Sequence, residues 1–174
     1  MRGLTQRLED ARSYRGAWLR PSNFESFWEP SVAFAQNAQV ESVIELPSAT
    51  QTATFKRITF ASTDQTQLSA RVVLPASSLA AELPAVVLFS DLGRGVRSWL
   101  HLLRFSALGM PVVALEARPC SAQLKDAWRG ALTVEELAHA LINPDDAASS
   151  TLKQLIDDAL VATSVASRFL GRTA

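Results

Sequence analysis

The chain has 174 residues, of which 48% are hydrophobic, so we expect one domain with a real core and exclude two ordinary domains. Lys plus Arg and Asp plus Glu both number 17, and this balance gives no reason to expect a nucleic acid or an anionic membrane as partner. No apolar run approaches the roughly 20 residues that span a bilayer, no signal peptide is recognisable, and the single cysteine excludes an internal disulfide, so we expect a cytoplasmic location.

A helix is predicted to start at Ser22 in the N-terminal segment. Ser22 and Glu25 have the spacing of a capping box, in which each side chain bonds the backbone amide of the other residue. Pro30 is expected to kink or shorten this helix, because proline removes an amide donor and clashes with the preceding turn. Three aromatic residues at i, i+3 and i+4 form a face that we expect to pack on the domain rather than to bind a ligand: Phe24, Phe27 and Trp28.

The pattern then changes to that of strands. Residues 40–46, 52–60 and 67–74 are each rich in β-formers or alternate between apolar and polar positions. The polar residues 62–66 between the last two strands predict a hairpin.

Residues 84–116 are predicted to form a βαβ unit. Two short apolar runs, residues 85–89 and 111–115, flank a loop and a segment with helical spacing of apolar residues. Ligands of parallel sheets bind beyond the carboxyl ends of the strands, so the loop at residues 90–95 is the first place to expect chemistry.

Two further helices are predicted in the rest of the chain. Residues 133–141 have a capping-box spacing followed by apolar residues four apart. Residues 150–170 keep helical periodicity up to Gly171, which is a natural helix stop.

Several of these stretches carry longer motifs. Residues 14–28 resemble the pattern Y-x-G … R-P-x-D-F-D-x-F-W, and residues 103–118 resemble LRWAALGYAVLAMDVRGQG. Residues 55–75 are similar to a TFTS-x-DG-x-x-L-x-A hairpin, and residues 83–89 to an LPAVVLFHGYGG strand and loop. Together these stretches resemble one family, the α/β-hydrolase carbohydrate esterases that include acetyl xylan esterases and cephalosporin C deacetylases.

The resemblance implies an α/β protein with a partial α/β-hydrolase fold. The expected part is the N-terminal half, a mixed sheet with an antiparallel hairpin and a βαβ unit, and with helices on both faces. Residues 1–174 would then be one truncated domain. Its parts would be a helical segment (1–38), the strands and hairpin (39–83), and the βαβ unit with the following helices (84–174).

The catalytic residues of such esterases are not found in the sequence. Serine esterases of this fold carry the nucleophile on a G-x-S-x-G elbow, followed by Asp and then His. No serine here has that glycine spacing, and His101 and His139 precede the place where the elbow would come. We therefore expect no catalytic residue in this chain, and a surface or packing role for both histidines.

The loop that resembles the family's oxyanion loop is altered. The backbone amide of Leu92 takes the place of the family's oxyanion donor, so the resemblance implies that Leu92 supplies an oxyanion-hole-like amide. The neighbouring Asp91 would place a carboxylate beside the developing negative charge and oppose its stabilisation. The D-x-RGQG loop keeps an acid, Glu116, and Arg118, but neither glycine.

Three other groups of residues invite a chemical interpretation. Cys120 has the residue type of a nucleophile, yet no base is placed beside it, and an inert thiol is the simpler interpretation. Residues 93–95 (GRG) lack the spacing of phosphate loops. The acidic pairs 145–146 and 157–158 are interpreted as solvated helix starts and faces rather than as a metal site. No cofactor and no metal is expected.

The strand that begins at Ala85 and ends at Phe89 is expected to lack a neighbour on one side, because the next hydrolase strand is not in the sequence. An uncharged apolar edge templates pairing with another chain, so we expect self-association or pairing with a complementing hydrolase half. Two functions follow: an esterase homologue that is inactive on its own, or the N-terminal part of a split deacetylase that acts on acetylated carbohydrates or small acetyl esters.

Overall fold

The computed structural model describes residues 6, 9, 12–13, 20–47, 50–76, 83–89, 96, 98–116, 118, 141–143 and 146–171. The helix predicted at 133–141 therefore lies outside the described residues, apart from its last position. In the described part of the chain, every helix is too short or too polar to cross a membrane.

Helix α2 covers Phe24–Asn37 and differs from the prediction at both ends. Its N-cap is Asn23, whose side chain makes no capping bond, and Glu25 forms an ion pair with Arg20 at 3.1 Å. The predicted capping box at Ser22 is therefore wrong. Pro30 does not shorten the helix, which continues for two more turns because those turns pack on the C-terminal helix and bury Ala35.

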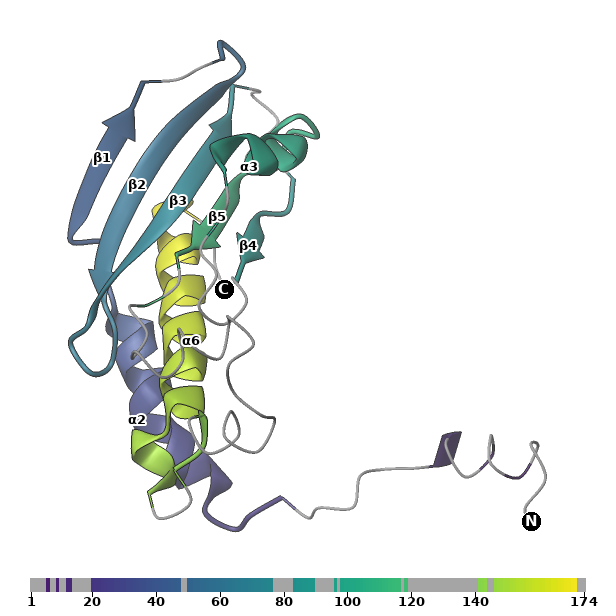
Figure 1. Ribbon diagram of the computed structural model, residues 1–174, viewed down its shortest axis with the longest axis vertical. Helices are drawn as coiled ribbons and strands as arrows, with labels where there is room; N and C mark the ends of the chain where they lie inside the picture. Colours follow the sequence, from purple (N-terminus) through teal and green to yellow (C-terminus); the bar gives the residue numbers. More distant parts are fainter. Residues whose placement is uncertain are drawn as a thin grey trace, which may run out of the picture.

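Among the described residues, five strands form one sheet in the order β1-β2-β3-β5-β4. The first three strands and β5 pair in an antiparallel manner, whereas β4 and β5 are parallel neighbours, as the βαβ prediction requires. The predicted hairpin joins β2 to β3 (Figure 1). The bounds of the strands are Ser42–Leu46 (β1), Ala53–Ala61 (β2), Gln67–Pro75 (β3), Val86–Leu88 (β4) and Val112–Leu115 (β5).

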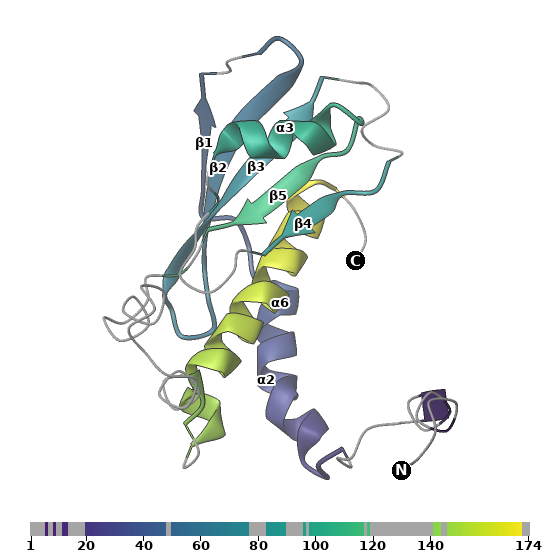
Figure 2. The same ribbon diagram turned by 45° about the vertical axis from the view of Figure 1, so that its right-hand side comes forward.

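Helices cover both faces of the sheet, as predicted (Figures 1 and 2). Helix α3, Trp99–Ser106, lies on one face, and α2 and α6, Thr151–Phe169, lie on the other. Helix α3 begins at a true cap, because the Ser98 side chain accepts a bond from the amide of Leu100. A short 3-10 helix, Ala147–Ser149, precedes α6.

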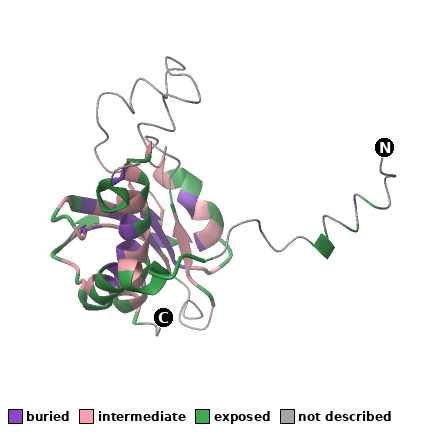
Figure 3. Cartoon of the chain, turned by 90° about the horizontal axis from the view of Figure 1, so that it is seen from below, coloured by how far each residue is buried: buried purple, intermediate pink, exposed green. Residues whose placement is uncertain are grey.

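The core consists of two apolar layers separated by the sheet. Strand alternation sends Phe60 and Val72 toward α2 and α6, and Phe55 and Val73 toward Leu102 of α3. Figure 3 shows that buried residues are concentrated in the sheet and on the helix surfaces next to it. Because both faces are covered, the parallel strands are apolar on both sides.

Strand β4 is an edge strand in the described part of the chain. It pairs with β5 on one side, and none of the described residues pairs with its other side. Phe89, directly after β4, is 50% exposed. The topology thus agrees with the expected position of this strand.

Candidate functional site

The edge of the sheet at the carboxyl ends of β4 and β5 is the place where the sequence predicted chemistry. The structure describes Phe89 after β4, and Glu116 and Arg118 after β5. Leu92, like the rest of the loop 90–95, lies outside the described residues, so its expected oxyanion role stays a prediction. The same holds for Cys120.

Glu116 is fixed by two neighbours on β3. Its carboxylate accepts hydrogen bonds from Ser69 Oγ and Arg71 Nε, both at 2.6 Å. Burial alone would raise the pKa of Glu116, but the bonds from Ser69 and Arg71 outweigh it, so the pKa lies below its ordinary value. A carboxylate held ionised and doubly bonded is a poor general acid or base at neutral pH.

Arg118 is the centre of an ionic network that connects three parts of the fold. Its guanidinium donates to both carboxylate oxygens of Asp158 on α6 at 2.7 Å, and to Asp64 in the β2–β3 turn at 2.7 Å. Its side chain is only 9% exposed. The hydrogen bond to Asp158 raises the pKa of Arg118, and the hydrogen bond from Arg118 lowers the pKa of Asp64 to about 2.

A second ion pair involves the residue just before Asp158 on α6. Lys153 Nζ donates to Asp157 at 2.6 Å and to Ser31 of α2 at 2.7 Å. The same ammonium lies 5.0 Å from the centre of the Trp28 ring, a cation–π distance. The aromatic face of α2 thus packs on α6 at Trp28, although Phe24 remains 41% exposed.

The interpretation of the acidic pair 157–158 as a solvated helix face is wrong. Asp157 is 4% exposed and Asp158 is 2% exposed, because the hairpin and the segment after β5 cover them. Buried carboxylates need partners, and the structure supplies Lys153 and Arg118. Helical periodicity could not reveal this burial, because it assigns an aspartate to the polar face of a helix by default. The sequence did contain one indication, since Arg118 is the residue retained from the RGQG motif.

No nucleophile with an activating base is present among the described residues. His101 lies exposed on α3. Ser62 is fully buried and donates its hydroxyl hydrogen bond to Asp158, so it serves the ionic network and has no access to a substrate. Within these residues there is also no group of His, Cys, Asp and Glu that could hold a metal ion.

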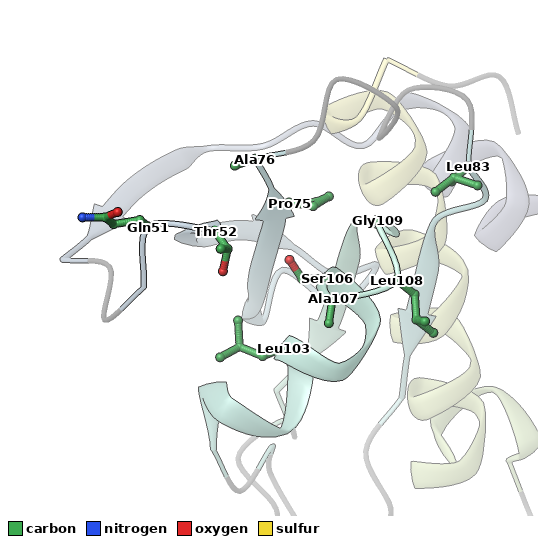
Figure 4. A pocket seen from close by; sticks show the side chains of 10 residues that line it. All are labelled: Gln51, Thr52, Pro75, Ala76, Leu83, Leu103, Ser106, Ala107, Leu108 and Gly109. Atoms are coloured by element: carbon green, nitrogen blue, oxygen red, sulfur yellow. The ribbon is translucent and has the colours of Figure 1, made fainter.

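A cavity of about 700 Å³ lies at the other end of the parallel strands, where β4 and β5 begin. Its lining comes from the start of β2, the end of β3, the chain before β4 and β5, and the C-terminal half of α3, including Pro75, Leu83 and Leu103 (Figure 4). This edge holds the amino ends of the parallel strands, away from the carboxyl ends where such sheets bind ligands. The ten described residues that line the cavity include no charged side chain and no histidine.

Comparison with known proteins agrees with this arrangement. The family model described as acetyl xylan esterase (AXE1) matches residues 1–169. The solved acetyl xylan esterase from Paenibacillus sp. R4 is 17% identical, with a TM-score of 0.54 over 63% of this chain and 35% of that enzyme. Acetyl xylan esterase 1 from Thermoanaerobacterium sp. JW/SL YS485 is 20% identical, with a TM-score of 0.56 over 67% of this chain and 36% of that enzyme.

A search of curated protein sequences found no match. The solved structures show that the chain has the fold of these esterases, over about a third of their length. The family model extends over nearly all of the sequence and includes the described strands β1 to β5. The chain therefore belongs to the acetyl xylan esterase (AXE1) family.

Proposed function

We propose that the polypeptide of residues 1–174 is an acetyl xylan esterase-like scaffold that does not hydrolyse esters on its own. The observation that carries this proposal is the bonding of the acidic residues near the carboxyl ends of β4 and β5. The described acids, Glu116, Asp64 and Asp158, are each engaged by an arginine. A hydrolase of this fold needs a free serine, a base and an orienting acid at those strand ends.

The sequence supports the same proposal. None of its seven glycines frames a serine as in G-x-S-x-G. Asp91 stands beside the position that resembles the oxyanion donor, where a negative charge opposes the stabilisation that such donors give. An esterase that relied on this loop would lose transition-state stabilisation through that charge.

A second candidate is the N-terminal part of a split deacetylase that acts on acetylated carbohydrates or small acetyl esters. It is favoured by the edge position of β4, whose outer side carries no strand among the described residues. A complementing polypeptide that carries the nucleophile, acid and histidine would add its strand there. The backbone groups on the outer side of β4 would supply the pairing.

Hydrolysis of p-nitrophenyl acetate by the purified chain tests the first candidate. We expect a rate equal to that of buffer with an equal concentration of albumin. A rate above this blank that a serine-directed phosphonate abolishes would contradict the proposal.

The second candidate needs a complementation assay. Any open reading frame directly downstream that encodes a G-x-S-x-G elbow would be co-expressed with this chain, and the co-purified pair would be assayed with the same ester. Activity that requires both polypeptides would replace the scaffold proposal by the split enzyme. Absence of such a reading frame, or an inactive pair, would leave the scaffold as the function.

A further inference from the structure

Two arginines face each other on the side of the sheet that carries α3. Arg57 of β2 is paired in register with Arg71 of β3. Both side chains point to the α3 side, because they lie two residues from Phe55 and Val73, which pack against that helix. Like charges at directly opposite positions of two strands repel each other, so this arrangement needs a compensating anion.

One carboxylate serves both arginines, but it forms a hydrogen bond with only one of them. Glu116 bonds Arg71 Nε at 2.6 Å and uses its other oxygen for Ser69 Oγ, also at 2.6 Å. The three groups together carry two positive charges and one negative charge. Among these three side chains, one unit of positive charge therefore remains uncompensated.

Arg57 has one unsatisfied donor, although Glu116 lies close enough to attract its charge. Its Nε is buried, and no described residue accepts a hydrogen bond from it. A buried donor without an acceptor in the protein is unusual in native structures, and a water molecule or an ion from solution can satisfy it. An anionic acceptor would satisfy this donor and also offset the second positive charge.

The neighbourhood is polar and reachable from the side of β1. The next row of the sheet toward the carboxyl ends of β4 and β5 carries Ser42, Thr59 and Ser69 on the same face. Ser42 and Thr59 are joined by a hydroxyl hydrogen bond of 2.7 Å. Beside Arg57 on β1, Ile44 is 52% exposed, so solvent reaches this end of the row.

The opposite end of the row is closed by an aromatic ring. The guanidinium of Arg71 lies 5.3 Å from the centre of the Trp99 ring, and Trp99 stacks on Phe55. An anion entering beside Ile44 would therefore meet the two arginines with an apolar wall behind them. Low local polarity strengthens the attraction between such groups.

We propose that Arg57 and Arg71 form a binding site for a monovalent carboxylate. The guanidinium fork matches the two oxygens of a carboxylate, and one negative charge neutralises the single positive charge that remains. A phosphate dianion would overcompensate the charge. The site adjoins Glu116 near the carboxyl end of β5, but it does not depend on the proposed function.

Nuclear magnetic resonance of the full chain tests this site, with acetate as the probe and chloride balancing the ionic strength. The Nε–H signal of Arg57, assigned from its loss in Arg57→Lys, is expected to shift with acetate in a saturable manner. Inorganic phosphate is expected to bind more weakly than acetate. No saturable shift would overturn the site, and tighter binding of phosphate would overturn the assignment to a carboxylate.

A variant of Arg57 and a matched control make the test specific. Arg57→Met is expected to weaken acetate binding at least tenfold, followed on the remaining signals of the site. Arg104→Met is the matched control, because Arg104 lies on α3 with its guanidinium over Phe105. The Arg104→Met chain should bind acetate as tightly as the unaltered chain does. Equal binding by Arg57→Met and the control would overturn the proposal.

Glu116→Gln guards against a variant that merely fails to fold. It removes the carboxylate that shares these arginines, so the remaining positive charge rises from one to two. Acetate should then bind several-fold more tightly, a gain that loss of structure cannot produce. Unchanged or weaker acetate binding in a folded Glu116→Gln chain would contradict the charge argument.

Discussion

A single charged residue can join segments of this fold that lie far apart in the sequence. Arg118 donates hydrogen bonds to the carboxylates of Asp64 and Asp158, which lie 54 and 40 residues away along the chain. Taking these charges out of water is costly, and the cost is offset only while all partners are present. The network therefore makes the structure sensitive to the loss of any one partner.

The first prediction concerns Asp158. Asp158→Asn removes the negative charge that faces the buried Arg118, and we expect the free energy of unfolding to fall by about 3 kcal/mol. The control is Glu25→Gln, whose exposed ion pair with Arg20 should contribute less than about 1 kcal/mol. Urea unfolding followed by circular dichroism measures both. Equal losses in the two variants would show that burial does not strengthen the network.

The second prediction concerns acid sensitivity. The hydrogen bond from Arg118 lowers the pKa of Asp64 from 3.8 to about 2, so its stabilising contribution is complete above the unfolded-state value. It is lost as the pH falls from about 4 toward 2. Glu116, with its pKa also lowered, adds to the loss in acid. Asp64→Asn should reduce the slope of unfolding free energy against pH in this window; an unchanged slope would contradict this assignment.

At the scale of elements, the ends of helices are determined by local backbone chemistry. Helix α3 is followed by Gly109 at φ +80°, and α6 is followed by Gly171 at φ +65°. Both are conformations that glycine adopts without the steric cost that a Cβ atom brings. A substitution there tests local strain rather than packing.

The third prediction compares the two glycines. A Cβ at Gly109 would lie 2.8 Å from Leu83 Cδ1, whereas a Cβ at Gly171 would meet nothing within 4 Å. Leu83 lines the cavity of about 700 Å³, so its side-chain end has space to move away. We therefore expect Gly109→Ala and Gly171→Ala to cost a similar amount, about 1–2 kcal/mol each. Thermal unfolding measures both, and a much larger loss at Gly109 would show that Leu83 is held rigidly.

At the scale of the whole molecule, the part of the sheet that the structure describes ends on one side with the uncharged apolar strand β4. Such an edge pairs readily with another strand, and natural proteins normally protect it with charge, proline or a bulge. The sequence around β4, AVVLF, has none of these protections. We propose that the chain associates through this edge, with a second copy or with a complementing polypeptide.

The fourth prediction tests this edge. Phe89→Lys places a charge directly after β4, where the native side chain is 50% exposed, and should shift the chain from oligomer to monomer. Leu100→Lys is the control, since Leu100 is 65% exposed on α3, away from the edge. Size-exclusion chromatography with light scattering gives the mass of each. A stable monomer of the unaltered chain at low concentration would contradict the proposed association.

Much of the architecture could be predicted from the pattern of residues. The alternation in β2 and β3, the polar turn between them and the helical spacing before Gly171 all reflect local periodicity, which a sequence displays directly. The N-terminus of α2 could not be predicted in the same way. Glu25 satisfies its charge with Arg20 instead of capping the helix, and a spacing rule cannot decide between two nearby partners.

Some features of the candidate site could also be predicted from the sequence, whereas others could not. Sequence spacing alone was sufficient to find that no G-x-S-x-G elbow is present and that Glu116 and Arg118 follow a strand. The burial of Asp157 and Asp158, and the arginine pair Arg57 and Arg71, were visible only in the structure. They depend on strand register and on helix docking between distant segments.

The sequence by itself determined the α/β class, the order of the elements and the resemblance to acetyl xylan esterases, because these depend on local periodicity and motif spacing. Only the tertiary structure decided which charges are buried together. Whether an aspartate is solvated or paired depends on what a distant segment places over it, and this is settled when the hairpin, β5 and α6 pack against one another.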